Sequence, residues 1–409
     1  MSKRFDELYG EIVTILRRDY AGCEAMGDRF DPRYYNQAIG QAWHDDRLNE
    51  LTFLRYVSQM LACIGDRRLR LELLPREGYQ PWSPGFYTRR YADALYVTAL
   101  AGETRLALGD RITAVNGGSP AKHRANIQKN FFYADDPERE DWHGLLKMAD
   151  TITVQHRSGS EETLSLEKHP RQAPMITPEL RELPGGVIYA RPGDGPADAL
   201  AETLAHTAMT ALVLDMRNAR GDETDYWPLL PFLCRARTPM AELLGDGEIV
   251  VNYTPLNCAL RAASFADLPG GDTYINELRQ KAGQGFRPER LEPETDVLPA
   301  LAPAAVAVLT DTWCRDGGES FVQSAKAAGA TLLGRPTLGT IDYSGDVSYA
   351  LDERYIFTWP TAATPAARAG RGIQGTGIAP DIYVPWTPAE LWDDRPLTRA
   401  LEHIQANKT

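Results

Sequence analysis

The sequence has few cysteines and no hydrophobic run long enough to cross a membrane. Its five cysteines, Cys23, Cys63, Cys234, Cys258 and Cys314, are odd in number, lie far apart and form no Cys-x-x-Cys pair. This spacing favours free thiols in a reducing compartment over a disulfide framework or a zinc site. A bilayer-spanning helix needs about 20 apolar residues, and no stretch of the sequence approaches that length. We therefore expect no interaction with a membrane.

Positive charge is also scarce. The 409 residues include 44 Lys and Arg against 56 Asp and Glu, which gives a formal net charge of −12. Such an acidic balance disfavours nucleic acids as partners. The first residues mix both charges in a helical pattern and lack the apolar core of a signal peptide, so we expect a cytoplasmic protein. The sequence has no phosphate loop, dinucleotide fingerprint or metal-ligand cluster, and we therefore expect no cofactor and no metal.

One stretch has the pattern of a βαβ unit. An apolar run at residues 305–309 is followed by a polar turn at 311–318 and a helical run at 319–328. A second apolar run comes at 331–333. Strand, turn, helix and strand in this order indicate a largely parallel sheet. Such sheets usually carry their chemistry at the carboxyl ends of the strands, so the turn before the helix is the candidate site.

The chain divides into three segments by pattern. In residues 1–75, apolar residues recur at spacings of three and four, which predicts amphipathic helices. Residues 76–172 contain short alternating runs and an Asn116-Gly117 turn signal, which predict a small β-rich module. Residues 173–409 alternate strand and helix patterns and form the predicted α/β core. Within that core, residues 246–299 are longer than a typical connection, which indicates a lid or a covering insertion.

Taken together, the motifs resemble those of the tail-specific, or carboxy-terminal processing, serine peptidases and their tricorn-like relatives. The resemblance rests on L-G-D-x-I-x-x-V-N-G at 108–117, L-D-x-R at 214–217, G-E at 318–319, G-x-x-T-x-G at 334–339 and G-I-x-P-D at 377–381. It implies an α/β fold, with a peptidase core of βαβ units, a helical N-terminal region and a PDZ-like β-rich module. A PDZ domain adds an extended peptide to a sheet edge. The implied partner is therefore a peptide or a protein C-terminus, and a homo-oligomer is compatible with it.

The catalytic positions of that family carry other residues in this chain. The nucleophilic serine of the family lies three residues before the glutamate at the helix start, and here that position is Asp316. The lysine base of the classical members corresponds to Thr340. The histidine and the glutamate of the tricorn-like members correspond to Arg68 and Gln374. An aspartate is a poor acyl-transfer nucleophile, and an arginine stays protonated and cannot act as a base. The resemblance thus implies a catalytically degenerate peptidase.

Two structural roles remain open for Asp316. The Asp-x-x-Glu pattern before an apolar helical run is typical of a capping box, in which Asp316 would cap the helix. Alternatively, a carboxylate at the nucleophile position and the guanidinium of Arg68 at the base position would form a bidentate salt bridge. The two roles can coexist.

Two function classes remain open as well. The first is a degenerate peptidase that binds peptides or protein C-termini. The second is an active serine-type or cysteine-type endopeptidase with a displaced nucleophile, for which Cys314 and Ser320 are the alternatives. A helix N-terminus can lower the pKa of a nearby thiol, which is the argument for Cys314. The residues expected to contact a peptide are Gly317, Gly318, Gly221 and Tyr343.

Overall fold

The computed structural model describes residues 3–27, 30–74, 82–127, 137–147, 149–170, 175–245, 247–266, 271–290, 295–300, 303 and 305–407. Contacts divide the chain into two units. Unit 1 combines Met1–Pro75, Asp246–Glu294 and Thr340–Gln374, and unit 2 combines Arg76–Gly245, Thr295–Gly339 and Gly375–Thr409. Both units thus combine stretches that are separated in the sequence. The prediction of three consecutive segments did not include this interleaving. The predicted boundaries at 75/76 and 172/173 lie outside the described residues.

Unit 1 is an antiparallel sheet with helices. The strands follow the order β1-β19-β13-β14, and β18 pairs with β19. The N-terminal helices bury apolar residues at helical spacing, such as Leu8, Ile12 and Ile15, which confirms the predicted helical region. The elements of unit 1 are α1 (Phe5–Arg18), α2 (Pro32–His44), α3 (Glu50–Ile64), β1 (Arg70–Leu73), β13 (Glu248–Tyr253), α8 (Pro255–Phe265), α9 (Gly271–Lys281), β14 (Gly285–Arg290), β18 (Tyr343–Ala350), β19 (Tyr355–Ala363) and α11 (Pro365–Arg368).

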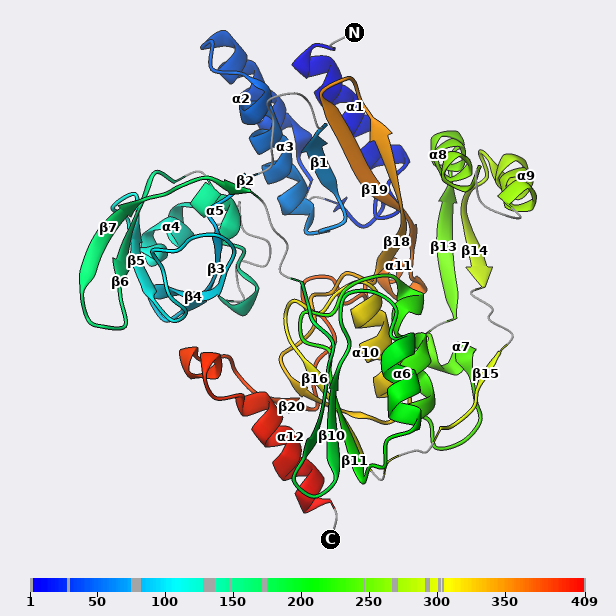
Figure 1. The fold of residues 1–409 in the computed structure, drawn as a ribbon. Helices are drawn as coiled ribbons and strands as arrows, with labels where there is room; N and C mark the ends of the chain where they lie inside the picture. Colours follow the sequence, from blue (N-terminus) through cyan, green and yellow to red (C-terminus); the bar gives the residue numbers. More distant parts are fainter. Residues whose placement is uncertain are drawn as a thin grey trace. The chain divides into compact units, whose positions relative to one another are not determined.

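The long segment expected to be a lid or a covering insertion is largely part of this sheet. Strand β13 pairs with β19 and with β14. Helices α8 and α9, which come between β13 and β14 in the sequence, pack on each other. Figure 1 shows the two helices together at one end of the β13–β14 pair. Over 247–266 and 271–290, the segment therefore extends the sheet of unit 1.

The β-rich module of unit 2 is a meander. Its five strands are antiparallel and follow the order β3-β4-β5-β6-β7. The chain turns at Asn116 and Gly117 with positive φ angles of 47° and 72°, as the Asn-Gly pair predicts. The β-rich character is confirmed, and the assignment as a PDZ domain stays a prediction. The elements are β2 (Trp82–Ser83), β3 (Phe86–Tyr91), β4 (Ala94–Leu100), β5 (Arg111–Val115), α4 (Pro120–Ile127), η3 (Pro137–Arg139), α5 (His143–Lys147), β6 (Thr151–Gln155), β7 (Glu161–Ser165) and β8 (His169–Pro170).

The α/β core of unit 2 is a six-stranded sheet in the order β20-β17-β16-β11-β10-β9. All neighbouring pairs are parallel except β9 with β10. Its elements are β9 (Glu179–Leu183), β10 (Val187–Arg191), α6 (Asp198–Ala205), β11 (Ala211–Asp215), η4 (Glu223–Phe232), β12 (Thr238–Pro239), α7 (Met240–Leu243), β15 (Asp296–Val297), β16 (Ala305–Thr310), α10 (Gly317–Ala327), β17 (Thr331–Gly334), β20 (Ile382–Tyr383), η5 (Pro388–Leu391) and α12 (Arg395–Ala406). The predicted βαβ unit is β16-α10-β17, and its helix begins two residues earlier than expected.

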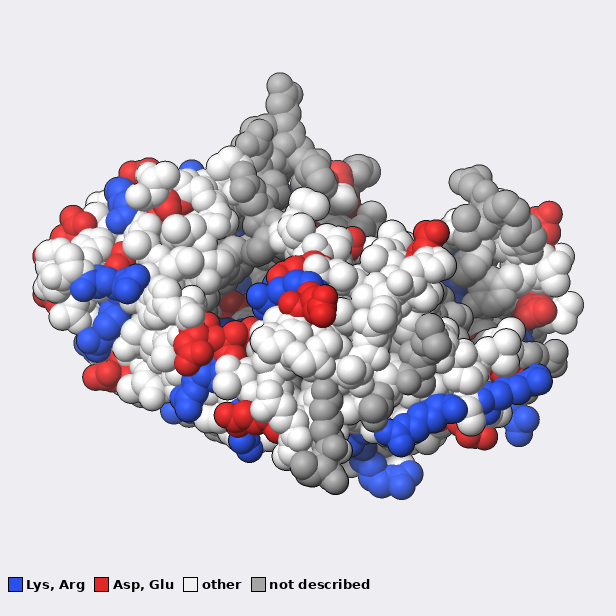
Figure 2. Space-filling model, turned by 60° about the horizontal axis from the view of Figure 1, so that its bottom comes forward, with Lys and Arg blue, Asp and Glu red and all other residues white. Residues whose placement is uncertain are grey.

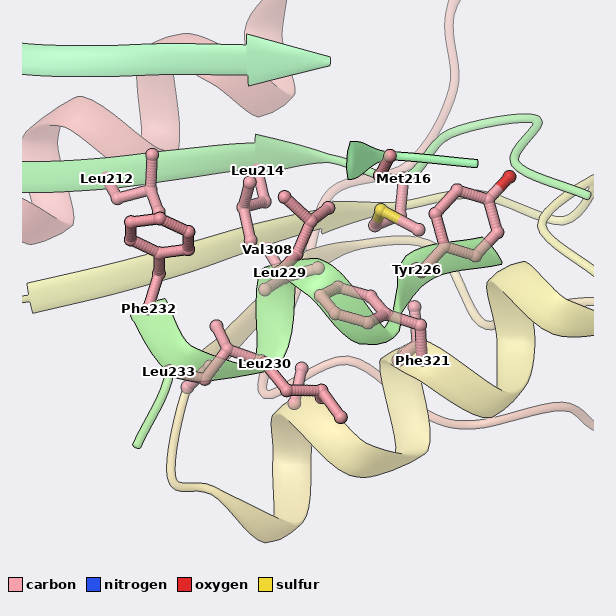
Figure 3. Close-up of a cluster of buried hydrophobic side chains, with 14 of the residues drawn as sticks. Leu212, Leu214, Met216, Tyr226, Leu229, Leu230, Phe232, Leu233, Val308 and Phe321 are labelled. Atoms are coloured by element: carbon pink, nitrogen blue, oxygen red, sulfur yellow. The ribbon is translucent and has the colours of Figure 1, made fainter. Parts of the chain in front are cut away.

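Helices cover both faces of this sheet. Successive residues of β11 point to opposite faces. Leu212 and Leu214 join the cluster under α6, η4 and α10, while Val213 packs with Leu397 and Ile404 of α12. Figure 3 shows Phe321 of α10 and the side chains of η4 meeting β11 and β16 in the first cluster. This packing fixes α10 against the ends of β11 and β16, where the candidate site lies.

One helix of this core is not an α-helix. Residues Glu223–Phe232 form the 3₁₀ helix η4. Pro228 and Pro231 are inside η4 and lack the N–H that an α-helical ladder requires. The tighter, irregular helix follows from these two residues.

The surface carries charges of both signs. On the face drawn in Figure 2, basic and acidic side chains lie interspersed over the described residues. Within the described part of the chain, none of the helices combines the length and the hydropathy of a membrane-spanning segment.

Candidate functional site

The candidate site of unit 2 is the turn between β16 and α10, residues 311–317, which we call the elbow. Asp316 has φ 51° and ψ −127°, a conformation that residues other than glycine rarely adopt. Such strain persists where the surrounding structure imposes it, and it clusters at functional sites. A sharp strand-to-helix turn of this kind is how α/β hydrolases expose a nucleophile. The backbone of Asp316 therefore has the kind of strained conformation found in such turns, and its side chain is a carboxylate.

The predicted capping role of Asp316 is wrong. Asp316 stands at the N-cap position of α10, but its side chain makes no capping hydrogen bond. At φ 51° the backbone departs from the extended conformation of a normal N-cap residue. Its carboxylate lies 3.6 Å from the guanidinium of Arg315.

The backbone N–H that follows Asp316 is used inside the protein. The Gly317 N–H donates to the carbonyl of Gly221 at 2.9 Å. A Cβ on Gly317 would collide with the Asp222 carbonyl, and one on Gly318 would meet the backbone of Ala219. Three glycines were expected to contact a peptide: Gly221, Gly317 and Gly318. The start of α10, with Gly317 and Gly318, is instead packed against the segment that contains Gly221. In hydrolases with such an elbow, the N–H after the nucleophile stabilises the oxyanion.

Glu319 explains two of the sequence motifs. Its side chain is fully buried and accepts hydrogen bonds from the Thr337 hydroxyl and, at 2.6 Å, from the Gly339 N–H. The G-E at the helix start and the G-x-x-T-x-G turn are therefore two halves of one contact. This contact has a structural role, because it holds the turn after β17 against α10.

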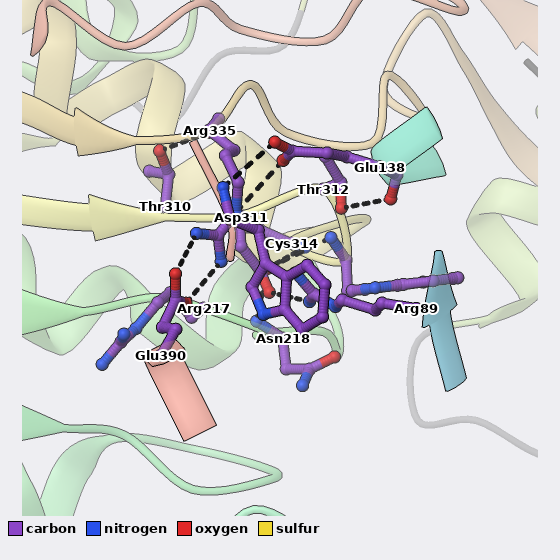
Figure 4. Close-up of polar contacts among 12 residues, drawn as sticks. Arg89, Glu138, Arg217, Asn218, Thr310, Asp311, Thr312, Cys314, Arg335 and Glu390 are labelled. Carbon is purple, nitrogen blue, oxygen red and sulfur yellow. Dashed lines mark hydrogen bonds and ion pairs between the residues drawn. The ribbon is translucent and has the colours of Figure 1, made fainter. Parts of the chain in front are cut away.

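The carboxylate of Asp311 connects the elbow to neighbouring segments (Figure 4). One carboxylate oxygen accepts the N–H groups of Asn218, Trp313 and Cys314, and the other pairs with Arg89 of β3 at 2.9 Å. Burial alone would raise the pKa of Asp311, but Arg89 and Arg335 hold it below the usual value. Asp311 was not among the predicted site residues, although its place directly after an apolar strand was the available signal.

Arg335 extends this network toward the C-terminal part of unit 2. Its side chain is 1% exposed and pairs with Glu390 at 2.8 Å and with Glu138 at 3.4 Å. Charges buried this deeply must be paired, because desolvation otherwise costs several kcal/mol. Figure 4 shows Arg335 between Glu138 and Glu390, beside Asp311. The β-rich module therefore contacts the elbow region through Arg89 and Glu138.

Neither proposed replacement nucleophile has the surroundings of one. The Cys314 side chain is fully buried, and burial, assisted by Glu319 and Asp311, raises its pKa well above that of a free thiol. Reactive cysteines have the opposite features, a low pKa and access to solvent. Ser320 lies in the first turn of α10, and its hydroxyl makes no hydrogen bond to any described residue.

We predict that Cys314 stays unmodified in the folded protein. Iodoacetamide should alkylate the exposed Cys63 quickly and Cys314 only after denaturation, because the thiolate is the reactive form. Peptide mapping by mass spectrometry over a time course measures both residues in one sample. Alkylation of Cys314 at the rate of Cys63 would contradict its burial.

In unit 1, Arg68 has its own partners. Its Nε donates to the Thr340 carbonyl at 3.0 Å, and its Nη1 lies 3.3 Å from a carboxylate oxygen of Asp346. Arg68 and Thr340, the two predicted base positions, are therefore in contact. Asp316 belongs to unit 2, and its predicted pair with Arg68 stays a prediction.

One pocket of unit 1 is lined by the other two predicted residues of this unit, Gln374 and Tyr343. The Gln374 N–H donates to Asp342 at 2.7 Å. The rings of Tyr343 and Tyr20 are 5.5 Å apart. Tyr20 was not named as a site residue, because nothing in the local pattern joins residue 20 to the strand at 343.

No metal site is found over the described residues, where no three His, Cys, Asp or Glu side chains gather closely enough to hold an ion.

Comparison with known proteins gives a fold. No protein-family model matches the chain. A search of curated protein sequences also finds no match. Among solved structures, mature CPAF complexed with lactacystin matches with a TM-score of 0.67 and 11% identity, over 98% of this chain and 97% of that one. Another structure of mature CPAF gives 0.61 and 11% identity, over 95% and 93%. A putative peptidase from Parabacteroides merdae gives 0.51 and 12%, over 98% and 96%.

Proposed function

We propose that this protein, which has the fold of CPAF and other tail-specific-type peptidases, binds peptides or protein C-termini without hydrolysing them. The observation that carries the proposal is Asp316 in the strained position of the elbow. A peptidase of this type needs a hydroxyl or thiol there and a base to remove its proton. Asp316 supplies a carboxylate instead, and loss of a serine from a triad lowers turnover by about a millionfold.

The donor arrangement around the elbow also supports the proposal. Acyl transfer needs N–H groups aimed at the developing oxyanion. The Gly317 N–H instead donates to the Gly221 carbonyl. To serve a substrate, this N–H would have to give up an existing hydrogen bond. A missing oxyanion-hole donor by itself lowers turnover by about 10²–10³-fold.

Peptide binding is supported by the β-rich module. Its meander ends in two edge strands, β3 and β7, and β7 is mostly exposed. Proteins of the PDZ type bind a peptide by adding it as a further strand to a sheet edge. The main-chain hydrogen bonds of such a strand need no catalytic residue, so binding can persist where hydrolysis is lost.

The expected result is a protein that binds and does not cut. A fluorophosphonate probe should leave the purified full chain unlabelled, and a library of unstructured peptides should remain intact by mass spectrometry. Fluorescence anisotropy with peptides that have free carboxyl termini should detect binding, which amidation of those termini should weaken. Trypsin treated in parallel is the positive control for the probe and for cleavage.

Two results would overturn the proposal. Labelling of one serine that heat denaturation abolishes, with peptide cleavage lost in the matching serine-to-alanine variant, would establish an active hydrolase. The Ser320→Ala and Cys314→Ala variants identify the residue if activity is found. The absence of any peptide binding would remove the binding half of the proposal.

A further inference from the structure

Unit 1 contains a pocket of about 490 Å³, a volume within the range of ligand sites, about 300–1,000 Å³. Segments far apart in the sequence form it: the turn after α1, the end of α3, the start of β18 and the loop after α11. The residues that line it include Tyr20, Asp342, Tyr343, Gly372 and Gln374. Among the residues that the structure describes, its walls carry one carboxylate, one amide and two phenols, and no lysine or arginine.

The carboxylate of Asp342 is the dominant charge of this pocket. Asp342 is 5% exposed and accepts a hydrogen bond from the Gln374 N–H at 2.7 Å. The chain at Gly372 passes so close to this carboxylate that a Cβ there would collide with it. No lysine, arginine or histidine of the described residues forms an ion pair with Asp342. Burial raises the pKa of this carboxyl group, as expected for a desolvated carboxylate without a cation.

The other polar groups complement a ligand with a cationic end. The side-chain nitrogen of Gln374 is buried and has no hydrogen-bond partner. A buried donor without a partner costs about 1–3 kcal/mol, which a ligand carbonyl would recover once the Gln374 side chain turns its nitrogen into the pocket. The rings of Tyr20 and Tyr343 lie 5.5 Å apart and tilted by 44°. Aromatic faces attract organic cations, and the guanidinium of arginine most often.

We propose that this pocket binds the cationic side chain of an arginine or lysine residue in a bound peptide. Asp342 pairs with the cation, the phenol rings contact its stem and head, and the Gln374 amide donates to a main-chain carbonyl. A metal ion fits less well, since no three acidic, histidine or cysteine side chains gather anywhere over the described residues. The nearby Arg368 is already paired with Glu24 at 2.8 Å and does not neutralise the pocket. This inference rests on the proposed peptide binding and adds a side-chain preference to it.

The test compares arginine with citrulline, which has the same shape and no charge. Isothermal titration of the full chain uses two peptides that differ only in this residue. We expect the arginine peptide to bind at least about tenfold more tightly, because the Asp342 carboxylate is already desolvated and close charge pairs across an interface couple strongly. The variant Asp342→Asn should abolish the difference and leave the citrulline peptide unaffected. The matched control Asp272→Asn, on the exposed face of α9, changes the net charge equally and should preserve the preference.

A smaller probe separates this inference from the proposed function. N-acetylarginine methylamide fits the pocket without requiring a peptide groove, and N-acetylcitrulline methylamide is its neutral partner. If peptides bind but arginine and citrulline bind equally, the pocket proposal is wrong and peptide binding stands. If no peptide binds but the arginine probe binds and Asp342→Asn removes it, the pocket stands and the proposed function fails. If neither peptide nor probe binds, both fail.

The variants also need a check of the fold. Asp342 accepts a hydrogen bond from the loop after α11, so the test must show that its replacement leaves that loop in place. Unchanged affinity for the citrulline peptide shows that the pocket is intact in Asp342→Asn. A second variant, Gln374→Leu, should lower the affinity for the arginine and citrulline probes by the same factor. The Gln374 amide that it removes is assigned to the main-chain carbonyl of the probe, which both probes share. A loss confined to the arginine probe would contradict the assigned role of Gln374.

Discussion

Replacing Asp311 by alanine is expected to lower the free energy of unfolding of unit 2 by about 3–5 kcal/mol. The Asp311 side chain is 3% exposed, and its removal leaves the guanidinium of Arg89, whose side chain is 13% exposed, without its counter-charge. Three backbone N–H groups at the elbow and at Asn218 lose their acceptor as well. Breaking a buried ion pair from one side is costly because the remaining charge stays desolvated. Urea denaturation followed by tryptophan fluorescence measures the loss.

A surface pair in the same unit provides the control for this prediction. Asp296 pairs with Arg237, whose side chain is 73% exposed. The variant Asp296→Ala should cost about 0–1 kcal/mol, because water replaces an exposed salt bridge at little cost. A loss below about 1 kcal/mol for Asp311→Ala, equal to that of the control, would show that the elbow does not depend on this network.

Replacing Asp66 by asparagine is expected to stabilise unit 1 by about 3 kcal/mol above pH 6, and to have no effect below pH 4. Asp66 is 4% exposed, and burial raises its pKa from 3.8 to about 6. A carboxyl group with a raised pKa in the folded state favours folding while protonated. Its contribution is complete below pH 4 and is lost as the pH rises through about 6. Asparagine stays neutral throughout and avoids that loss.

Urea denaturation of wild type and Asp66→Asn from pH 4 to pH 8 measures the difference. The two curves should separate with rising pH and run parallel above the folded-state pKa. Asparagine keeps an acceptor for the Arg68 N–H and can pair with the Tyr20 hydroxyl, both of which Asp66 contacts. The exposed control Asp272→Asn should show no pH-dependent gain. Equal stability of the Asp66→Asn variant and wild type at pH 8 would contradict the raised pKa.

Much of the fold could be predicted from local patterns. The βαβ unit appears in the sequence as an apolar run, a polar turn, a helical run and a second apolar run, and it is β16-α10-β17 in the structure. Phe321, Val322 and Ala325 are buried on one face of α10, as helical periodicity requires. The 3₁₀ character of η4 could also have been inferred, because the sequence itself shows its two internal prolines.

The candidate site shows where local patterns stop. Asp-x-x-Glu before a helix predicts a cap, yet Asp316 has a positive φ and makes no capping hydrogen bond. Glu319, the last residue of that pattern, accepts hydrogen bonds from Thr337 and Gly339, which lie beyond the next strand. Both departures depend on segments that reach α10 only in the folded chain. The local pattern could not rank these distant partners against the nearby ones.

The sequence by itself determined the order and type of most helices and strands, and the fact that an aspartate occupies the predicted nucleophile position. These follow from side-chain periodicity and motif order, which the local backbone geometry sets. Only the tertiary structure decided that separated stretches interleave into two units, that Arg89 pairs with Asp311, and that Tyr20 shares a pocket with Asp342. Buried polar groups take whichever partners folding brings within reach, because leaving them unpaired costs more than any local preference supplies.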